Sequence, residues 1–392
     1  MVGLPGQSDI IIIGGGVIGS SVAYNLLNDG FTGQITIFEK DKLYEFSSTP
    51  RSAGGVRQLF TTSVNIQISR YSLHKYQTFP EDMAIGNEKA EIDFKQRGYL
   101  FLASNNENMN QLEKQRQLQK QHGVPVELLD KSDLLNVIPE LNTDDLQGGL
   151  YCAEDGYLDP YSVMQGYIRK AKQLGADYIY EEVDTILYEK GFVRGVQLKN
   201  GSRHTSPIVI NCAGPWAPYI SKKINLPIPV VPLKRQIIQF DIAKELERLL
   251  PLTIDPTGVY FRHEGDSLIT GYSEQTNPGI DFQWKRSFFE EQLWPILAHR
   301  IQNFEQAKII RGWAGLYSHN TEDQNAIIGE HPKLGGYFLV CGFSGHGMQQ
   351  APAVGKGISE SIMTGTYQTL DLSALRFERF ATNELIVENA IV

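Results

Sequence analysis

The sequence predicts a mixed fold that combines the α/β and α+β classes, and three observations lead to this prediction. A β-rich run, a glycine-rich turn, a helical pattern and a second β-rich run follow one another in residues 9–39. Residues 227–312 carry short alternating strands instead, and the first pattern returns at residue 336. We therefore expect a discontinuous Rossmann-like nucleotide-binding domain with a β-rich substrate domain inserted into it.

The N-terminal unit has the order strand, turn, helix, strand. Residues 9–13 are a β-branched run typical of a buried strand. The glycines of residues 14–19 predict a tight turn, and residues 20–28 predict a helix that Gly30 ends. Residues 34–39 predict the second strand, which finishes on an acid.

The next part of the chain continues this pattern. Asp159 and Pro160 predict an N-cap and a first helical residue. Asn200-Gly201 predicts a hairpin with a type I′ turn. The remaining segments predict a loop at 46–60, helices at 64–79 and 105–122, a strand at 178–187, and a buried strand at 208–214 that ends at glycine.

The β-rich insertion begins after Pro227. Short strands are expected at 236–240, 258–262 and 267–271, and a helix at 288–300. A buried strand at 336–342 and a helix at 351–363 return to the first pattern. We expect the nucleotide-binding domain to comprise 1–85, 146–226 and 313–392, and the substrate domain to comprise 86–145 and 227–312.

The charge balance argues against two classes of partner. Thirty-six Lys and Arg residues against 45 Asp and Glu residues give a net charge of −9. Nucleic acids and anionic membranes are bound mainly through Lys and Arg. We therefore expect no nucleic-acid partner and no general membrane-binding surface.

The cysteines, the first apolar stretch and the N-terminus bear on metal binding, membrane insertion and cellular location. Cys152, Cys212 and Cys341 lie far apart without a CxxC pair, which argues against a disulfide scaffold and a zinc site, so no metal is expected. The uncharged stretch 10–27 contains four glycines, so we expect no membrane span. Without a basic N-terminal region we expect a cytoplasmic protein, or one of the mitochondrial matrix if a presequence has been removed.

The strongest chemical signal is Gly14-x-Gly16-x-x-Gly19 between a strand and a helix, with Glu39 at the end of the next strand. Gly14 permits the turn, Gly16 lets the backbone approach a pyrophosphate, and Gly19 allows helix–sheet packing. The helix N-terminus favours phosphate charge, and Glu39 would accept hydrogen bonds from a ribose. This pattern indicates a dinucleotide cofactor.

A second glycine-rich loop at 342–347 separates the candidate cofactors. It follows a strand and precedes a helix, and such a loop lets backbone lie against a flat ring. The helix can direct its positive end at a flavin. We therefore expect FAD, because an NAD-dependent dehydrogenase would leave this loop without a role.

These motifs resemble those of the FAD-dependent oxidoreductase family that contains D-amino-acid oxidase, glycine oxidase and sarcosine oxidase. The resemblance also uses Asp155-Gly156-x-x-Asp159-Pro160, 211–216, Thr321-x-Asp323 and 327–329. Within the family it is strongest to the subgroup of FAD-dependent oxidoreductase domain-containing protein 1, a mitochondrial complex I assembly factor. The matches to this subgroup are 52–55, 258–262, 323–325 and 342–352.

The resemblance implies two sets of site residues. Those expected to contact FAD are Gly14, Gly16, Val17, Ile18, Gly19, Glu39, Lys40, Ser47, Ser48, Thr49, Ser52, Ala53, Gly54, Gly55, Val183, Ala213, Gly214, Trp216, Gly342, Gly345, His346, Gly347, Met348 and Gln349. Those expected on the substrate side, with catalytic or binding roles, are His346, Arg57, Arg262, Tyr260, Tyr317 and Gln349.

Departures from the family pattern shape these expectations. The positions used by relatives for covalent attachment carry Gly315 and Arg51 or Ser52, so FAD should be non-covalent. Gln349 replaces a carboxylate-binding lysine, and Ile269 replaces a lysine on the flavin face. Alternation along the strand puts Arg262 on the face of Tyr260, so we expect this pair to bind the polar end of the substrate. Arg57 and Arg235 are the next candidates.

The family implies oxidation of an amine or N-substituted amino acid by hydride transfer to flavin N5, giving an imine that hydrolyses. The electron acceptor stays open among oxygen, a quinone and a protein. The alternative is an assembly factor that keeps the flavin fold and binds respiratory-complex subunits with little turnover.

Overall fold

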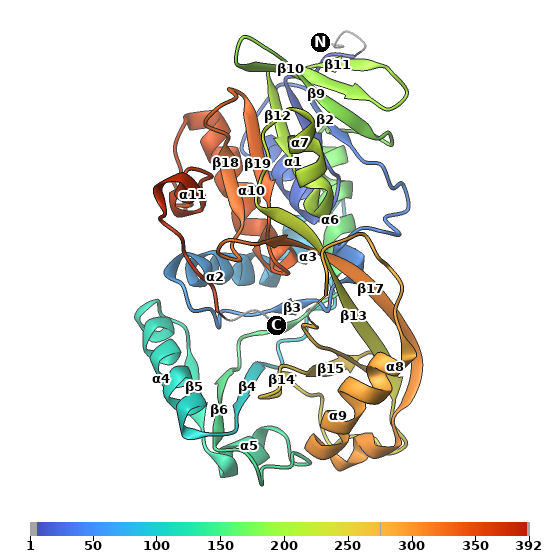
Figure 1. Cartoon of the computed structure of the whole chain (residues 1–392), viewed down its shortest axis with the longest axis vertical. Coiled ribbons are helices and arrows are strands. Elements are labelled where there is room, and N and C mark those ends of the chain that lie inside the picture. The colour runs from blue at the N-terminus through green and yellow to red at the C-terminus, as the bar shows by residue number, and fades with distance from the viewer. Residues whose placement is uncertain (1–5, 275, 390–392) are drawn as a thin grey trace.

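The computed structural model describes residues 6–274 and 276–389. Two large sheets dominate it, one in the upper and one in the lower half of Figure 1. The architecture matches the predicted combination of a Rossmann-like part with a β-rich part.

The upper sheet has six strands and a mainly parallel arrangement. The central strand β1 (Ile10–Ile13) pairs in parallel with β2 (Ile35–Phe38) and β12 (Ile208–Asn211). The strand β8 (Asp177–Ile179) extends one edge, and β19 (Tyr337–Cys341) and the antiparallel β18 (Ile327–Glu330) extend the other. Parallel neighbours bring the carboxyl ends of β1, β2 and β12 to one edge of the sheet.

Both faces of this sheet are covered, which explains its apolar strands. Ile10 and Ile12 belong to a core shared with helical residues, whereas Ile11 and Ile13 face a second core. The first face carries α1 (Val17–Asn28), α2 (Ser63–Gln77), α6 (Pro160–Gln173) and α10 (Gly347–Thr364). The second carries α7 (Ala217–Lys223) and a three-stranded sheet of β9 (Val183–Glu189), β10 (Phe192–Leu198) and β11 (Arg203–Thr205).

The lower sheet has eight strands, and its outer strands come from distant parts of the chain. Their order is β17 (Lys308–Asn320), β13 (Val230–Asp241), β16 (Ser267–Gly271), β15 (Tyr260–Glu264), β14 (Leu252–Ile254), β4 (Tyr99–Ala103), β6 (Gly148–Cys152) and β5 (Val126–Leu129). Short helices pack on the face away from the upper sheet: α5 (Lys131–Val137), α8 (Arg286–Phe288) and α9 (Trp294–Arg300).

Smaller elements complete the described chain. A two-stranded sheet pairs β3 (Gly55–Val56) with β7 (Gly156–Tyr157). The remaining helices are α3 (Phe79–Asp82), α4 (Asn106–Gln121) and α11 (Arg379–Thr382), together with a π-helical turn at Phe289–Leu293 and 3₁₀ turns at Thr49–Arg51, Gly214–Trp216, Gln302–Gln306 and Ser373–Leu375. No helix in the described ranges is long and apolar enough to cross a membrane.

Several local expectations differ from the structure. The first helix begins at Val17, because Gly16 serves as its N-cap, and 178–187 is two strands rather than one. The hairpin at Asn200-Gly201 forms, but only Gly201 has a positive φ (87°), so the turn is not type I′. Two of the expected domain limits separate strands that belong to one sheet. β6 lies after the expected limit at residue 146 but pairs within the eight-stranded sheet, and the expected limit at residue 313 lies inside β17.

Candidate active site

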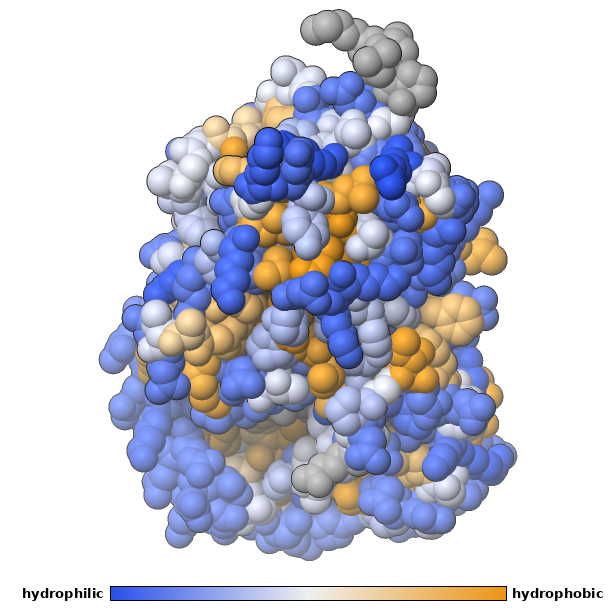
Figure 2. All heavy atoms as spheres, turned by 45° about the horizontal axis from the view of Figure 1, so that its top comes forward, coloured by the Kyte–Doolittle hydropathy of each residue, from blue (hydrophilic) through white to orange (hydrophobic). Residues whose placement is uncertain are grey.

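One elongated cavity of about 580 Å³ lies between the two sheets. Its walls come from the carboxyl ends of β1, β2 and β12 and from the facing side of the eight-stranded sheet. On the face shown in Figure 2, apolar side chains gather in the upper half and hydrophilic ones surround them. The kinds of residue that line the cavity differ between its two ends.

The glycine turn forms one end. Gly14 has φ 99°, and a Cβ atom there would lie 2.6 Å from the carbonyl oxygen of Cys212. A Cβ at Gly19 would lie 2.0 Å from the carbonyl oxygen of Gly14, so this glycine packs the helix on the sheet and does not line the cavity. Gly16, Val17 and Ile18 do line it, at the start of α1. The N-terminal N–H groups of a twelve-residue helix therefore face space that suits a pyrophosphate.

Glu39 and Lys40 follow β2 and line the same end. The two carboxylate oxygens of Glu39 accept N–H bonds from Gly15 and Asp41, each at 2.8 Å. Burial raises the pKa of Glu39, although these backbone bonds act in the opposite direction. Each oxygen keeps a further lone pair for a ribose hydroxyl. The ammonium of Lys40 lies 3.7 Å from the ring centroid of Trp216.

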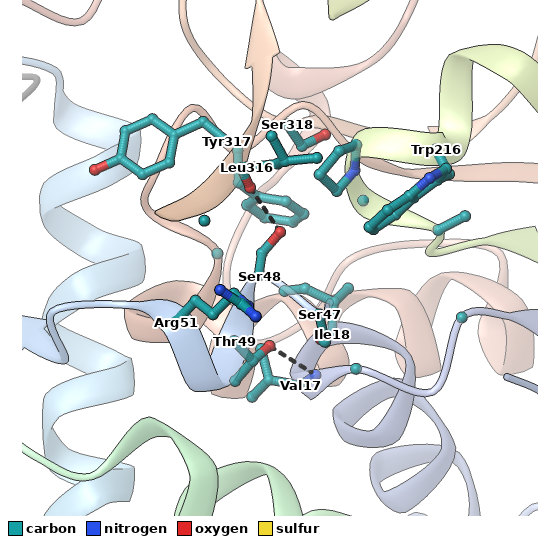
Figure 3. Close-up of a pocket in the computed structure, with 18 of the residues that line it drawn as sticks. Val17, Ile18, Ser47, Ser48, Thr49, Arg51, Trp216, Leu316, Tyr317 and Ser318 are labelled. Carbon is teal, nitrogen blue, oxygen red and sulfur yellow. Dashed lines mark hydrogen bonds between the residues drawn. The ribbon is translucent and has the colours of Figure 1, made fainter. Parts of the chain in front are cut away.

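The loop of residues 47–55 crosses the middle of the cavity, and Figure 3 shows two of its contacts. Ser48 Oγ donates to the carbonyl oxygen of Leu316 at 2.6 Å, and Thr49 Oγ1 accepts from the N–H of Val17 at 3.4 Å. Ser47, Ser52, Ala53 and Gly55 also line the cavity. Gly54 does not, because its φ of 71° places it against the carbonyl oxygen of Leu158.

The nucleotide end is completed by Val183, Ala213, Gly214 and Trp216, all of which line the cavity as expected. Sequence reasoning missed the ionic rim beside them. It consists of Glu182 paired with Lys199 at 2.8 Å and Asp184 paired with Lys223 at 2.5 Å. No motif announces these pairs, because β9, β10 and α7 bring them together only in the folded protein.

The final glycine loop forms the opposite wall. Gly345, His346, Gly347, Met348 and Gln349 line the cavity. Gly342 does not, but it has φ 76° at the end of β19 and makes the turn possible. Gly345 has φ 98°, and a Cβ atom there would lie 2.6 Å from the ring of Tyr317. The N-terminus of α10 is thereby directed into the cavity.

The substrate end combines an arginine with a histidine. Arg57 Nη2 lies 3.3 Å from Nε2 of His346, and its guanidinium lies 4.1 Å from the ring centroid of Phe60. Gln349 Oε1 accepts from the backbone N–H of Arg57 at 3.0 Å. Burial, together with the charge of Arg57, lowers the pKa of His346 to about 3. The imidazole is therefore neutral at physiological pH.

Tyr260 and Tyr317 line this end, and burial raises the pKa of both phenols. Both hydroxyls therefore stay protonated and can donate hydrogen bonds. Tyr99 lines the same space, as do the guanidinium groups of Arg51 and Arg235. Arg51 is held by the carbonyl oxygens of Glu45 at 2.6 Å and Ala314 at 2.8 Å.

Arg262 does not line the cavity, although alternation puts it on the Tyr260 face of β15. Its Nε donates to the carbonyl oxygen of Ala53 at 2.7 Å, and its Nη1 pairs with Glu264 at 2.5 Å. The guanidinium also stacks on Tyr157 at 4.6 Å. Arg262 thus anchors the loop of residues 47–55, and its hydrogen-bonding groups are used there rather than in the cavity.

In the described ranges, no three His, Cys, Asp or Glu residues lie close enough together to hold a metal ion. The three cysteines are buried as free thiols, and burial raises the pKa of Cys212, which lines the cavity. Gly315 and Arg51, at the expected attachment positions, lie against each other.

The comparisons agree with this geometry. A family model of FAD-dependent oxidoreductases matches residues 9–361, so the chain belongs to that family, and its cofactor is FAD. FAD-dependent oxidoreductase domain-containing protein 1 of Xenopus laevis is 34% identical over 99% of this chain and 85% of that protein. Mitochondrial sarcosine dehydrogenase of Homo sapiens is 26% identical over 92% of this chain but only 40% of that protein.

Two solved structures extend the likeness to three dimensions. L-proline dehydrogenase from P. horikoshii is 29% identical with a TM-score of 0.89, over 98% of this chain and 100% of that one. Glycine oxidase from Geobacillus kaustophilus is 23% identical with a TM-score of 0.83, over 95% and 99% of the two chains. The protein is therefore an FAD-dependent oxidoreductase, and the cavity has the form that this cofactor requires.

Because neither attachment position carries Cys or His, we expect FAD to be held without a covalent bond. Acid precipitation of the purified protein should release all of its yellow colour into the supernatant. Flavin that stays with the washed pellet would contradict this expectation.

Replacing Glu39 by alanine should weaken FAD binding by about tenfold to a hundredfold, because charge-assisted hydrogen bonds are lost. Calorimetric titration of the apoprotein with FAD measures this change. Glu45→Ala removes an exposed carboxylate from the same region and serves as the control. Equal affinity of the Glu39 variant and the wild type would refute the ribose assignment.

His346 should make folding less favourable in acid. Between its folded pKa of about 3 and its ordinary value of 6.5, the unfolded chain binds a proton that the folded protein does not. The free energy of unfolding therefore falls as the pH falls through this window, by up to about 1.4 kcal/mol per pH unit. His346→Gln should flatten this fall in denaturant titrations, whereas the exposed His74→Gln should not.

Proposed function

We propose that the protein oxidises the carbon–nitrogen bond of an amine in an amino acid or N-substituted amino acid. A hydride leaves the carbon next to the nitrogen, and the resulting imine is hydrolysed. When bound, FAD supplies the acceptor of this hydride at its N5 atom. No strong base is required if the amine binds in its neutral form.

The main support for the proposal is that different residues line the two ends of one cavity. A phosphate-binding helix start and the ribose acid Glu39 occupy one end, and Arg57, His346 and two tyrosines occupy the other. Relatives support the choice of substrate class, since their names refer to sarcosine, dimethylglycine, L-proline and glycine.

The side chains at the substrate end suit this chemistry. The positive charge of Arg57 can attract a substrate carboxylate, while its Nη1 donates to the carbonyl oxygen of Leu59. The protonated hydroxyls of Tyr260 and Tyr317 can orient the polar part of the substrate. Neutral His346 adds no charge beside the amine. Catalysis by this end would consist of orientation and electrostatics rather than proton abstraction.

A substrate panel tests the proposal. N-methylated amino acids, proline and glycine are added to the protein without oxygen, and the visible absorbance of oxidised flavin is followed. At least one member should bleach it in a concentration-dependent manner. A yellow protein that no amine bleaches would favour the alternative, an assembly factor that binds respiratory-complex subunits.

A further inference from the structure

The proposed reaction assigns no role to Arg235, a further cation that lines the cavity. Arg235 lies on β13 opposite Gly315 of β17 and lines the cavity. Its Nη1 donates to the carbonyl oxygens of Lys234 at 2.9 Å and Glu274 at 3.0 Å. Its Nε is buried and has no hydrogen-bond partner among the described residues. These two backbone bonds fix the guanidinium and leave donors for a ligand.

The charge of Arg235 also lacks a close counter-ion. No carboxylate of the described residues lies within the 4.0 Å that defines an ion pair. The nearby Glu274 carboxylate instead accepts from Gln236 Nε2 at 2.9 Å. Burial lowers the pKa of Arg235, but a guanidinium stays protonated in proteins. A guanidinium whose buried Nε has no partner and which lacks a counter-ion favours an arriving anion.

Arg235 and Arg57 are held on different walls of the cavity. The guanidinium of Arg235 lies 5.1 Å from the ring centroid of Tyr317, on the eight-stranded sheet. Arg57 follows β3 and stacks on Phe60 beside His346, at the start of α10. Arg57, Arg235 and Tyr317 all line the same cavity. In Figure 3, Tyr317 lies on the opposite side of Ser48 from Trp216, which marks the nucleotide end.

We propose that the substrate carries a second carboxylate, which Arg235 binds, so that Arg235 is a specificity-determining residue. This inference rests on the proposed function, in which Arg57 binds the first carboxylate. Besides Arg51, which backbone carbonyl oxygens hold, the cavity is lined by Arg57 after β3 and by Arg235 of β13, so a cation comes from each of two separate elements. The protonated hydroxyl of Tyr260, which lines the same cavity, adds a donor that suits an acid group. The predicted class is an amino acid with an acidic side chain or an acidic N-substituent.

A matched pair of ligands without an amine tests the inference by binding alone. (Methylthio)acetate has one carboxylate, and thiodiacetate has a second one in place of a terminal methyl hydrogen. Their affinities for the FAD-loaded protein are measured by perturbation of the flavin spectrum and by calorimetry. The wild type should bind thiodiacetate at least about tenfold more tightly, because it makes an additional charged contact.

Three variants locate the second carboxylate. Arg235→Gln should remove the preference for thiodiacetate and change the affinity for (methylthio)acetate by less than about threefold. Arg57→Gln should weaken both ligands by a similar factor. Lys234→Met is the control for charge, because this neighbouring lysine pairs with Asp281 at 2.6 Å and does not line the cavity, so the preference should stay.

Each outcome decides the matter. No preference in the wild type, or an equal loss of both ligands in Arg235→Gln, would overturn the second carboxylate site. If Arg235→Gln does not fold, Arg235→Lys is used, because it retains the charge and should keep part of the preference for thiodiacetate. If Arg235→Lys binds FAD normally but shows no such preference, the role of Arg235 is limited to its hydrogen bonds with backbone carbonyl oxygens. A preference for thiodiacetate without bleaching by iminodiacetate or any other amine would contradict the proposed reaction but not this binding site.

Discussion

The loop of residues 47–55 contacts both sheets at once, and the geometry of the candidate site depends on these contacts. Thr49 accepts from the start of α1 below the six-stranded sheet, while Ser48 donates to β17 of the eight-stranded sheet. Arg51 donates to the backbone carbonyl oxygen of Ala314 in β17, and Arg262 of β15 donates to that of Ala53 in the loop. These hydrogen bonds connect the two sheets through the loop that crosses the cavity.

Electrostatic character changes along the cavity because different elements supply each end. The helix starts of α1 and α10 both point into it and favour negative charge. At the far end burial keeps His346 neutral and the tyrosines protonated, so the arginines there carry the positive charge. The two helix starts and the arginines thus make the cavity electropositive along its length.

The two ends of the cavity are built from different groups. The cofactor end uses backbone groups and glycines, which leave little room for variation: a Cβ atom at Gly14 would lie 2.6 Å from a carbonyl oxygen. The sheet strands instead present side chains to the cavity, among them Tyr99, Arg235, Tyr260 and Tyr317. A strand exchanges one inward side chain without moving its backbone. The same fold can thus serve relatives whose names refer to different amino acids.

The sequence by itself determined the cofactor end. Glycine spacing, β-branched runs and the acid at Glu39 are local signals, so the turn and the strands on either side of it were predicted, with the helix beginning earlier than expected, at Val17. Many of the residues expected to contact FAD line the cavity. Tertiary structure decided the substrate end. Strand alternation placed Arg262 beside Tyr260, yet the loop carbonyl of Ala53 and Glu264 take up its guanidinium. The ionic rim and the open donor of Arg235 likewise arise from strand pairing between distant segments. Which partner a long charged side chain finds depends on distances that only the packed sheets set.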